Sequence, residues 1–280
     1  MAQSDPARQP GAGPWHARQG IQRVLQFTDL HLYADPDQTL FGVPTRSTFE
    51  AVLAQSQVRH WPPDVILFTG DLVHDERLEG YRYLRQVIDR CGIPCFCIPG
   101  NHDHKGLLAK AVDALAAEPF RAERIGSWDL LLLDSTIDGS DAGRLQPGTL
   151  EAVEQHLASN QGRPTLISLH HQPVPVGSRW IDTMKVEDGA ALLGLTARYP
   201  QLRLILWGHV HQSFDRRQGS TRLLATPSTC AQFAPGHEEF TLDDEPPGYR
   251  WLELHADGRL NTGIERVEVI PQAVEKPLLC

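Results

Sequence analysis

Five short motifs rich in aspartate and histidine each follow an apolar run, and they constrain the fold of this 280-residue chain more than any other feature. The motifs are Asp29-Leu30-His31, Gly70-Asp71, Gly100-Asn101-His102-Asp103, His170-His171 and Gly208-His209-Val210-His211. In open α/β sheets, ligands bind beyond the carboxyl ends of the strands. We therefore expect the five motifs to meet at one edge of a sheet built from the preceding runs.

The segments around the motifs alternate between two kinds of pattern. Short apolar stretches predict strands at residues 22–27, 65–69, 95–98, 129–134, 165–169 and 202–207. Helical patterns predict helices at residues 45–59, 77–90, 105–117, 149–158 and 186–198. Further strands are expected at residues 222–226, 249–255 and 260–269. This alternation indicates an α/β fold with a largely parallel or mixed sheet.

The chain shows no internal repeat and no low-complexity linker, which favours a single domain. We expect this domain to span residues 21–270, between a flexible N-terminal arm at 1–20 and a C-terminal tail at 271–280. Hydrophobic residues make up 41% of the chain, so a large core can be buried, and a single α/β domain of this length is common.

Charge and composition limit the kinds of partner that this protein is expected to bind. The net charge is −9 and no basic cluster is present, so a nucleic acid polymer is not an expected partner. No stretch approaches the roughly 20 apolar residues of a membrane span, so no membrane partner is expected. The five cysteines lack the spacing of a zinc or redox motif, which indicates reduced thiols. We expect a soluble, cytoplasmic protein.

The motif side chains supply hard oxygen atoms and imidazole nitrogen atoms. This mixture suits Mn, Fe, Zn or Co rather than calcium or an iron–sulfur cluster. The ligands are too many for one ion and about right for two, so we hypothesise a two-metal phosphoester hydrolase. Only one of His170 and His171 can face the site if the segment is extended, and the residues alone leave that choice open.

In this order, the motifs resemble those of the calcineurin-like metallophosphoesterase superfamily: D-x-H, G-D, G-N-H-[DE], a strand-end H and G-H-x-H. The resemblance covers roughly residues 22–255. Residues 169–171, 223–233 and 251–258 look like the bacterial class III 3′,5′-cyclic-AMP phosphodiesterases. The resemblance implies a four-layer α/β/β/α sandwich of mixed sheets flanked by helices. It also implies hydrolysis of 3′,5′-cyclic AMP to 5′-AMP, by attack of a hydroxide shared between two metal ions.

The resemblance also implies a role for each motif residue. One ion would be held by Asp29, His31 and His211, the other by Asn101, His170 and His209, with Asp71 bridging both. His102 would be the general acid, and Asp103 would be catalytic by orienting His102 or a neighbouring ligand. Substrate contacts are expected at His31, Asp71, Asn101, His102 and His211. The expected ions are Fe and Mn, with Zn, Co or Ni as alternatives.

Departures from sister families and competing hypotheses narrow this interpretation. Position 75 is Asp where serine/threonine phosphatases carry Arg, and position 74 is His where purple acid phosphatases carry Tyr. The alternative substrates are other small phosphodiesters, such as glycerophosphodiesters or 2′,3′-cyclic nucleotides. A catalytically inactive binding module is disfavoured, because all seven implied ligands and His102 are present. Phe233 either stacks on a purine or packs in the core. For the oligomeric state, a homodimer is one option.

Overall fold

The computed structural model of the chain describes residues 20–268. The expected N-terminal arm, apart from its last residue, and the C-terminal tail lie outside these described residues. Within residues 20–268, no helix has both the length and the apolar character needed to cross a membrane.

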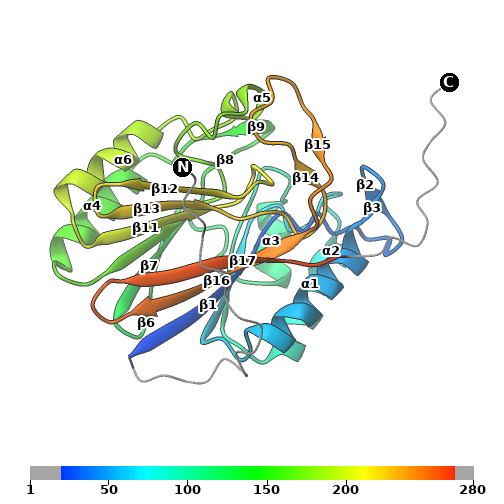
Figure 1. The fold of residues 1–280 in the computed structure, drawn as a ribbon, viewed down its shortest axis with the longest axis horizontal. Coiled ribbons are helices and arrows are strands. Elements are labelled where there is room, and N and C mark those ends of the chain that lie inside the picture. Colours follow the sequence, from blue (N-terminus) through cyan, green and yellow to red (C-terminus); the bar gives the residue numbers. More distant parts are fainter. Residues whose placement is uncertain (1–19, 269–280) are drawn as a thin grey trace, which may run out of the picture.

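Two mixed sheets form the centre of the molecule (Figure 1). The first sheet has the order β17 (Leu260–Arg266), β16 (Gly248–His255), β1 (Ile21–Phe27), β4 (Val65–Thr69), β5 (Cys95–Ile98). The second has the order β12 (Phe214–Gln218), β13 (Thr221–Ala225), β11 (Leu202–Trp207), β10 (Thr165–Ser168), β7 (Trp128–Leu133), β6 (Phe120–Ile125). β1, β4 and β5 are parallel, as are β7, β10, β11 and β13. Their carboxyl ends therefore point the same way within each sheet.

Helices cover the outer faces of both sheets. The helices are α1 (Thr45–Arg59), α2 (Leu78–Cys91), α3 (Lys105–Ala111), α4 (Thr149–Ser159), α5 (Arg179–Asp182) and α6 (Gly189–Arg198). Phe49 and Leu84 of α1 and α2 pack on the first sheet, while α4 and α6 pack on the second. Buried side chains of both sheets, including Leu67 and Trp128, form a third cluster between them. The expected four-layer α/β/β/α architecture is confirmed.

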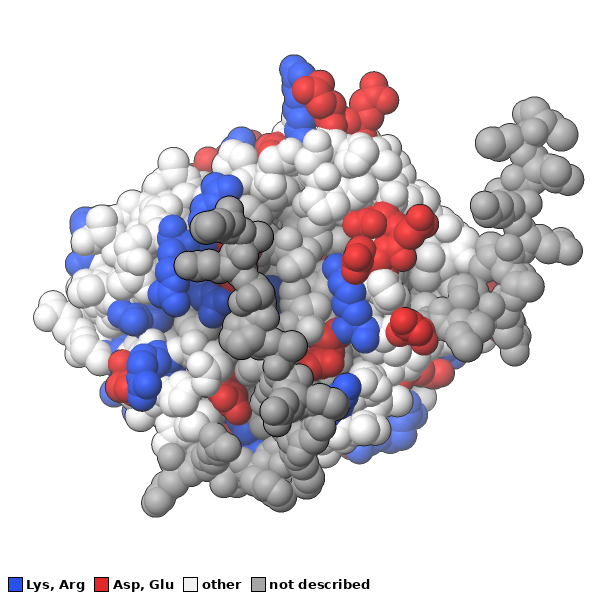
Figure 2. All heavy atoms as spheres, viewed as in Figure 1, with Lys and Arg blue, Asp and Glu red and all other residues white. Residues whose placement is uncertain are grey.

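The antiparallel edge strands β6 and β12 were not expected from the sequence. β12 carries four consecutive exposed residues at 215–218, and Figure 2 shows Lys and Arg side chains gathered over the β12–β13 edge. Charged side chains on an edge strand block unwanted pairing with another chain. Such a strand has no apolar run, and so it gives no strand signal.

Three short hairpins and the end of one helix also differ from expectation. The hairpins are β2–β3 (Thr39–Leu40, Val43–Pro44), β8–β9 (Thr136–Ile137, Ser140–Gly143) and β14–β15 (Gln232–Phe233, Leu242–Asp243). Their strands are too short to show a period. Helix α3 ends at Ala111 rather than at residue 117. Just beyond that end, the Asp113 carboxylate pairs with Arg121 of β6 at 2.8 Å.

The cysteines within the described residues behave as predicted. Cys91, Cys95, Cys97 and Cys230 are all free thiols. Burial raises the pKa of Cys95 and of Cys230 to about 12. A thiol with such a pKa stays protonated near neutral pH and acts as a small apolar side chain.

A buried polar network joins the two sheets. The Gln26 amide of β1 donates to Thr69 Oγ1 at 2.8 Å and to the Trp207 carbonyl at 3.2 Å. The Thr226 hydroxyl donates to Gln26 Oε1 and accepts from Arg250 Nε at 3.0 Å. Because β4 ends at Thr69 and β11 at Trp207, the network lies one residue below two of the motifs. It therefore fixes the position of one strand end relative to the other.

We expect Gln26→Leu to lower the free energy of unfolding by about 2 kcal/mol, because it leaves buried polar partners unsatisfied. The midpoint of urea denaturation measures this loss. Gln57→Leu is the matched control, since Gln57 lies on the exposed face of α1, and its midpoint should change little. Equal midpoints for the two variants would contradict a stabilising role of the network.

Candidate metal centre

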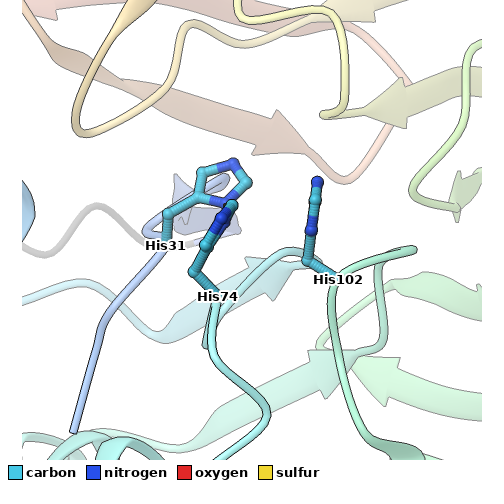
Figure 3. Close-up of side chains that lie close together, drawn as sticks. All are labelled: His31, His74 and His102. Carbon is cyan, nitrogen blue, oxygen red and sulfur yellow. The ribbon is translucent and has the colours of Figure 1, made fainter. Parts of the chain in front are cut away.

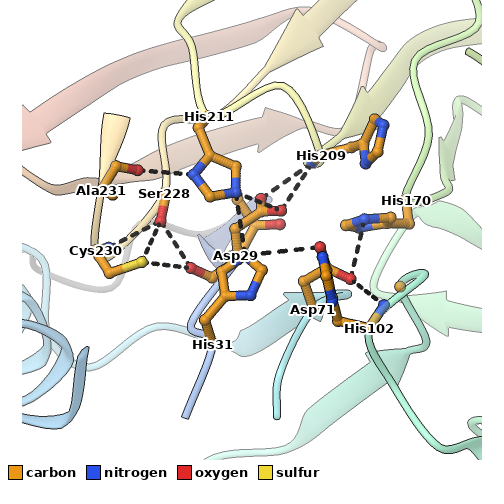
Figure 4. A network of polar contacts seen from close by, with 12 residues as sticks. Asp29, His31, Asp71, His102, His170, His209, His211, Ser228, Cys230 and Ala231 are labelled. Carbon is orange, nitrogen blue, oxygen red and sulfur yellow. Dashed lines mark hydrogen bonds and ion pairs between the residues drawn. The ribbon is translucent and has the colours of Figure 1, made fainter. Parts of the chain in front are cut away.

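The five motifs meet where the carboxyl ends of β1, β4, β5, β10 and β11 converge (Figure 4). The loops after β1 and β4 run side by side, with Asp29 N donating to the Gly70 carbonyl at 3.0 Å and His31 N to the Asp71 carbonyl at 2.9 Å. From the second sheet, His209 N donates to both carboxylate oxygens of Asp29 at 3.1 Å. Backbone bonds therefore hold motifs from both sheets together.

Backbone strain is concentrated in these motifs. Seven non-glycine residues among the described ones have positive φ. Five of them lie in the motifs: Asp29, His31, Asp71, His209 and His211, with φ between 46° and 63°. A left-handed conformation is uncommon for non-glycine residues, although aspartate and histidine adopt it more often than most, and it persists only where the surrounding structure enforces it. Strain of this kind clusters at functional sites.

The glycines of three motifs permit close approach. A Cβ atom at Gly70 would overlap the His170 ring, and one at Gly100 would overlap the backbone and carboxylate of Asp71. At Gly208 it would overlap Thr28 and Asp29. Each glycine thus lets a neighbouring functional side chain lie directly against its backbone, which explains why the motifs begin with glycine.

One group of candidate ligands consists of Asp29, His31 and His211. Each offers one ligand atom within 4.8 Å of the other two. The Nε2 atoms of His31 and His211 lie 3.2 Å apart, and His211 Nε2 lies 3.4 Å from Asp29 Oδ1. All three residues are buried. Two imidazole nitrogens that face each other at this distance need a shared proton or a cation between them.

The second group surrounds His170. Its Nε2 lies 3.2 Å from Asn101 Oδ1 and 3.4 Å from Asp71 Oδ1, while the other oxygen of Asp71 lies 3.7 Å from His31 Nε2. The two oxygens of Asp71 therefore face different groups. His209 packs beside His170 with 5.1 Å between ring centroids, and its Nε2 is buried without a hydrogen-bond partner. A buried nitrogen without a partner fits a metal ligand.

Hydrogen bonds fix the orientation of three of these rings. His170 Nδ1 donates to the Thr69 carbonyl at 2.8 Å, and His211 Nδ1 to the Ala231 carbonyl at 2.7 Å. His31 Nδ1 lies 3.0 Å from Nδ1 of His74. Each contact leaves Nε2 directed into the centre, and metal-binding histidines typically use their second nitrogen in this way. The side chains present therefore fit a metal site.

His171 lies beside His170 and His209 and offers a ligand atom within 4.8 Å of theirs. Its Nδ1 lies 2.9 Å from Ser135 Oγ, and Gly143 packs against its ring. Burial and the adjacent His170 lower the pKa of His171 to about 3, so the ring is neutral. Its Nε2 has no hydrogen-bond partner, but it is His170 that faces the Asp71 carboxylate.

The electrostatics of the centre differ between residues. Burial opposes charge on both Asp71 and His170, yet their attraction holds the pKa of Asp71 well below its usual value and raises that of His170 to about 9. For His31 and His209 burial dominates and lowers the pKa well below 6.5. Neutral imidazoles are the form that binds metals.

His102 and His74 form a histidine cluster with His31 (Figure 3). The His74 and His102 rings stack with 4.6 Å between centroids, and the His102 ring lies 5.1 Å from the His31 ring. His102 is half-buried and lines the cleft. In the sequence, His74 only separates families, and no motif predicts its contact with His31. The signal was its position three residues after Asp71, in a loop paired with residue 32.

Asp103, expected to orient His102 or a neighbouring ligand, contacts the backbone beside Asp71 and Asn101. Its carboxylate accepts hydrogen bonds from the backbone N–H groups of Leu72 and Gly100 at 2.9–3.1 Å, and from the Tyr81 hydroxyl at 3.0 Å. Burial and the nearby Asp71 raise the pKa of Asp103 to about 6. Asp103 therefore ties the loops after β4 and β5 together and does not orient the His102 ring.

Asp141 of hairpin β8–β9 also reaches the site, although it lies outside the five motifs. The Asn101 side chain donates from Nδ2 to Asp141 Oδ1 at 3.4 Å, so its carbonyl oxygen faces His170. An amide held in this way presents its acceptor atom to the centre. No motif marks Asp141, because the short hairpin brings it to the site from a distant part of the chain.

Comparisons with known proteins agree with this arrangement. Residues 22–213 match the sequence profile of the calcineurin-like phosphoesterases. The 3′,5′-cyclic adenosine monophosphate phosphodiesterase CpdA of Pseudomonas aeruginosa is 42% identical over 245 residues, covering 88% of this chain and 90% of that protein. Its counterpart from Escherichia coli strain K12 is 40% identical over 246 residues, with the same coverage. A dimetal phosphatase from Danio rerio shares the fold, with a TM-score of 0.60, 14% identity and coverage of 86% and 98%.

We expect Gly100→Ala to displace Asp71 and to reduce metal binding, which elemental analysis after Mn²⁺ loading and desalting measures. A displacement of about 1 Å at such a centre costs roughly a hundredfold in hydrolysis of a synthetic diester. Gly194→Ala is the control, because no atom lies within 4 Å of the added Cβ in helix α6. Full metal content in the Gly100 variant would contradict the close-approach argument.

Proposed function

Since the chain belongs to the calcineurin-like phosphoesterase family, we propose that it hydrolyses 3′,5′-cyclic AMP to 5′-AMP with the help of two metal ions. The observation that carries the mechanism is the position of Asp71, whose two carboxylate oxygens face two separate groups of ligands. The substrate follows from the cyclic-AMP phosphodiesterases that align over most of both chains.

In this proposal, each group of ligands holds one ion. Asp29, His31 and His211 would hold the first, whereas Asn101, His170 and His209 would hold the second, and Asp71 would serve both. For the first ion, the ligand atoms of Asp29, His31 and His211 lie within 4.8 Å of one another. For the second, His170 Nε2 lies 3.2 Å from Asn101 Oδ1 and 3.4 Å from Asp71 Oδ1. We propose Fe and Mn as the ions, with Zn, Co or Ni as alternatives, because ligands of this type accept several first-row metals.

When bound, the ions supply positive charge that lowers the pKa of water and stabilises negative charge on the phosphoryl oxygens. The remaining chemistry belongs to the protein. Substrate would contact His31, Asp71, Asn101, His102 and His211. The Thr69 and Ala231 carbonyls and the His74 ring hold three histidines in position, so that little reorganisation is needed during the reaction.

His102 is the proposed proton donor to the departing ribose 3′-oxygen. An alkoxide of this kind is a poor leaving group, so a general acid accelerates its departure. The His102 ring lines the cleft, and its backbone N–H donates to Asp71 Oδ1 at 2.9 Å. That bond places the ring beside the bridging carboxylate.

The predicted homodimer and cytoplasmic location remain predictions.

The first experiment compares Mn²⁺-loaded protein with EDTA-treated protein on 3′,5′-cyclic AMP, following 5′-AMP by chromatography. We expect turnover only in the loaded protein, and we expect Asp71→Ala to lose both turnover and metal. Hydrolysis of bis-p-nitrophenyl phosphate without hydrolysis of cyclic AMP would shift the proposal to other small phosphodiesters. Activity that survives complete metal removal would refute the two-metal mechanism.

A second experiment tests the proton donor. His102→Ala should keep its metal content but hydrolyse cyclic AMP roughly a hundred- to ten-thousandfold more slowly. p-Nitrophenyl esters should be less affected, because p-nitrophenolate departs without a proton. His237→Ala, at an exposed position, is the control for a general effect of removing a histidine. An equal loss on both kinds of substrate would argue against the general acid role.

A further inference from the structure

Aromatic residues from three separate segments form one side of the cleft above the candidate metal centre. Phe41 follows β2, Trp180 lies in α5, Phe233 lies in β14 and Phe240 precedes β15. The Phe240 ring centroid lies 5.1 Å from those of Phe41 and Trp180 and 5.2 Å from that of Phe233. The cleft, of about 220 Å³, is lined by these four rings together with metal-centre residues such as Asp71 and His102.

The inner two rings of this group are structural. Phe233 is 8% exposed and stacks face to face on the His211 ring, with 4.0 Å between centroids and 8° between planes. That face is therefore occupied by a candidate ligand. Trp180 packs its ring against Phe233 and Phe240 in edge-on geometry. The stacking of Phe233 on His211 favours a packing role for Phe233.

The outer two rings have the opposite character. Phe41 is 51% exposed and Phe240 is 45% exposed, although phenylalanine is usually buried. Phe41 also has a φ of 52°, which is a clear outlier for a bulky residue. An exposed aromatic pair held with backbone strain at the mouth of a cleft fits a ligand-binding surface better than a folding requirement.

We propose that Phe41 and Phe240 form a stacking surface for the nucleobase of the substrate whose phosphodiester lies at Asp71 and His102. This inference rests on the proposed function. This stacking surface lies close to the candidate metal centre, because Phe233 contacts both His211 and Phe240. In a nucleotide only a ribose separates base and phosphate. Aromatic rings stack on every base, so the stacking surface favours nucleotides over phosphodiesters without a planar group.

The surroundings favour a base over a membrane surface as the occupant. Phe41 and Phe240 line the same cleft as the metal-centre residues. Glu238 and Glu239 directly precede Phe240 and are exposed. Their charges would repel an anionic lipid surface, whereas a neutral base that enters the cleft avoids them.

Kinetic measurements with a matched pair of substrates test whether the stacking surface binds the base. The pair is cyclic AMP and methyl ribofuranoside 3′,5′-cyclic phosphate, which has a methoxy group in place of the base. Phe240→Ala should reduce kcat/KM for cyclic AMP by about tenfold, mainly through KM, since stacking on one aromatic ring is lost. The base-free analogue should change less than about twofold, because stacking contributes nothing to it. Phe240→Tyr should restore the wild-type KM.

Leu242→Ala is the matched control variant. Leu242 lies in the same hairpin and is 44% exposed, but it is not part of the cleft lining. Its kinetics should match the wild type on both substrates. An equal loss on both substrates in Phe240→Ala, or no loss on either, would overturn the base-stacking role.

A binding measurement separates this inference from the proposed function. Adenosine has no phosphate, so its binding does not depend on the reaction. We expect isothermal titration to show adenosine binding to the wild type and to Leu242→Ala, and about tenfold weaker binding to Phe240→Ala. Adenosine binding without cyclic-AMP hydrolysis would refute only the proposed function. Hydrolysis of cyclic AMP without adenosine binding to the wild type would overturn only the proposed stacking surface.

Discussion

The attraction between the Asp71 carboxylate and the histidine rings on either side of it is the interaction on which the site depends. One carboxylate oxygen faces His31 and the other faces His170. This geometry requires strand ends from both sheets to lie within a few ångströms of one another. Two features allow this close approach. The motif glycines let neighbouring loops touch, and the Gln26 network below them joins the two sheets. The chemistry is therefore a property of the junction between the sheets, and no single motif supplies it.

Much of this architecture was predictable because the motif-bearing strands are largely apolar. The observed bounds of β4, β5 and β11 coincide with the predicted ranges, since each run is bounded by turn residues and is too short for a typical helix. Edge strand β12 and the short hairpins escaped prediction for the opposite reason. Their charge or brevity conceals the period, and only tertiary pairing stabilises them.

The candidate site shows the same division between local and long-range information. The motif spacing pointed to the residues that gather around Asp71. It said nothing about Asp141, which reaches Asn101 across 40 positions of sequence, and it left open which groups Asp103 contacts. A carboxylate next to a catalytic histidine in sequence can point in any direction. In the folded chain, Asp103 satisfies backbone N–H groups of two loops instead.

The positive φ angles of the motif residues set stability against chemistry. A non-glycine residue in the left-handed region costs of order 1–3 kcal/mol, although aspartate and histidine adopt it more often than most residues do. At Asp29, His31, Asp71, His209 and His211, glycine would therefore relieve the backbone. Glycine has no ligand atom to offer, so the side chains that gather at this centre come at the expense of backbone stability.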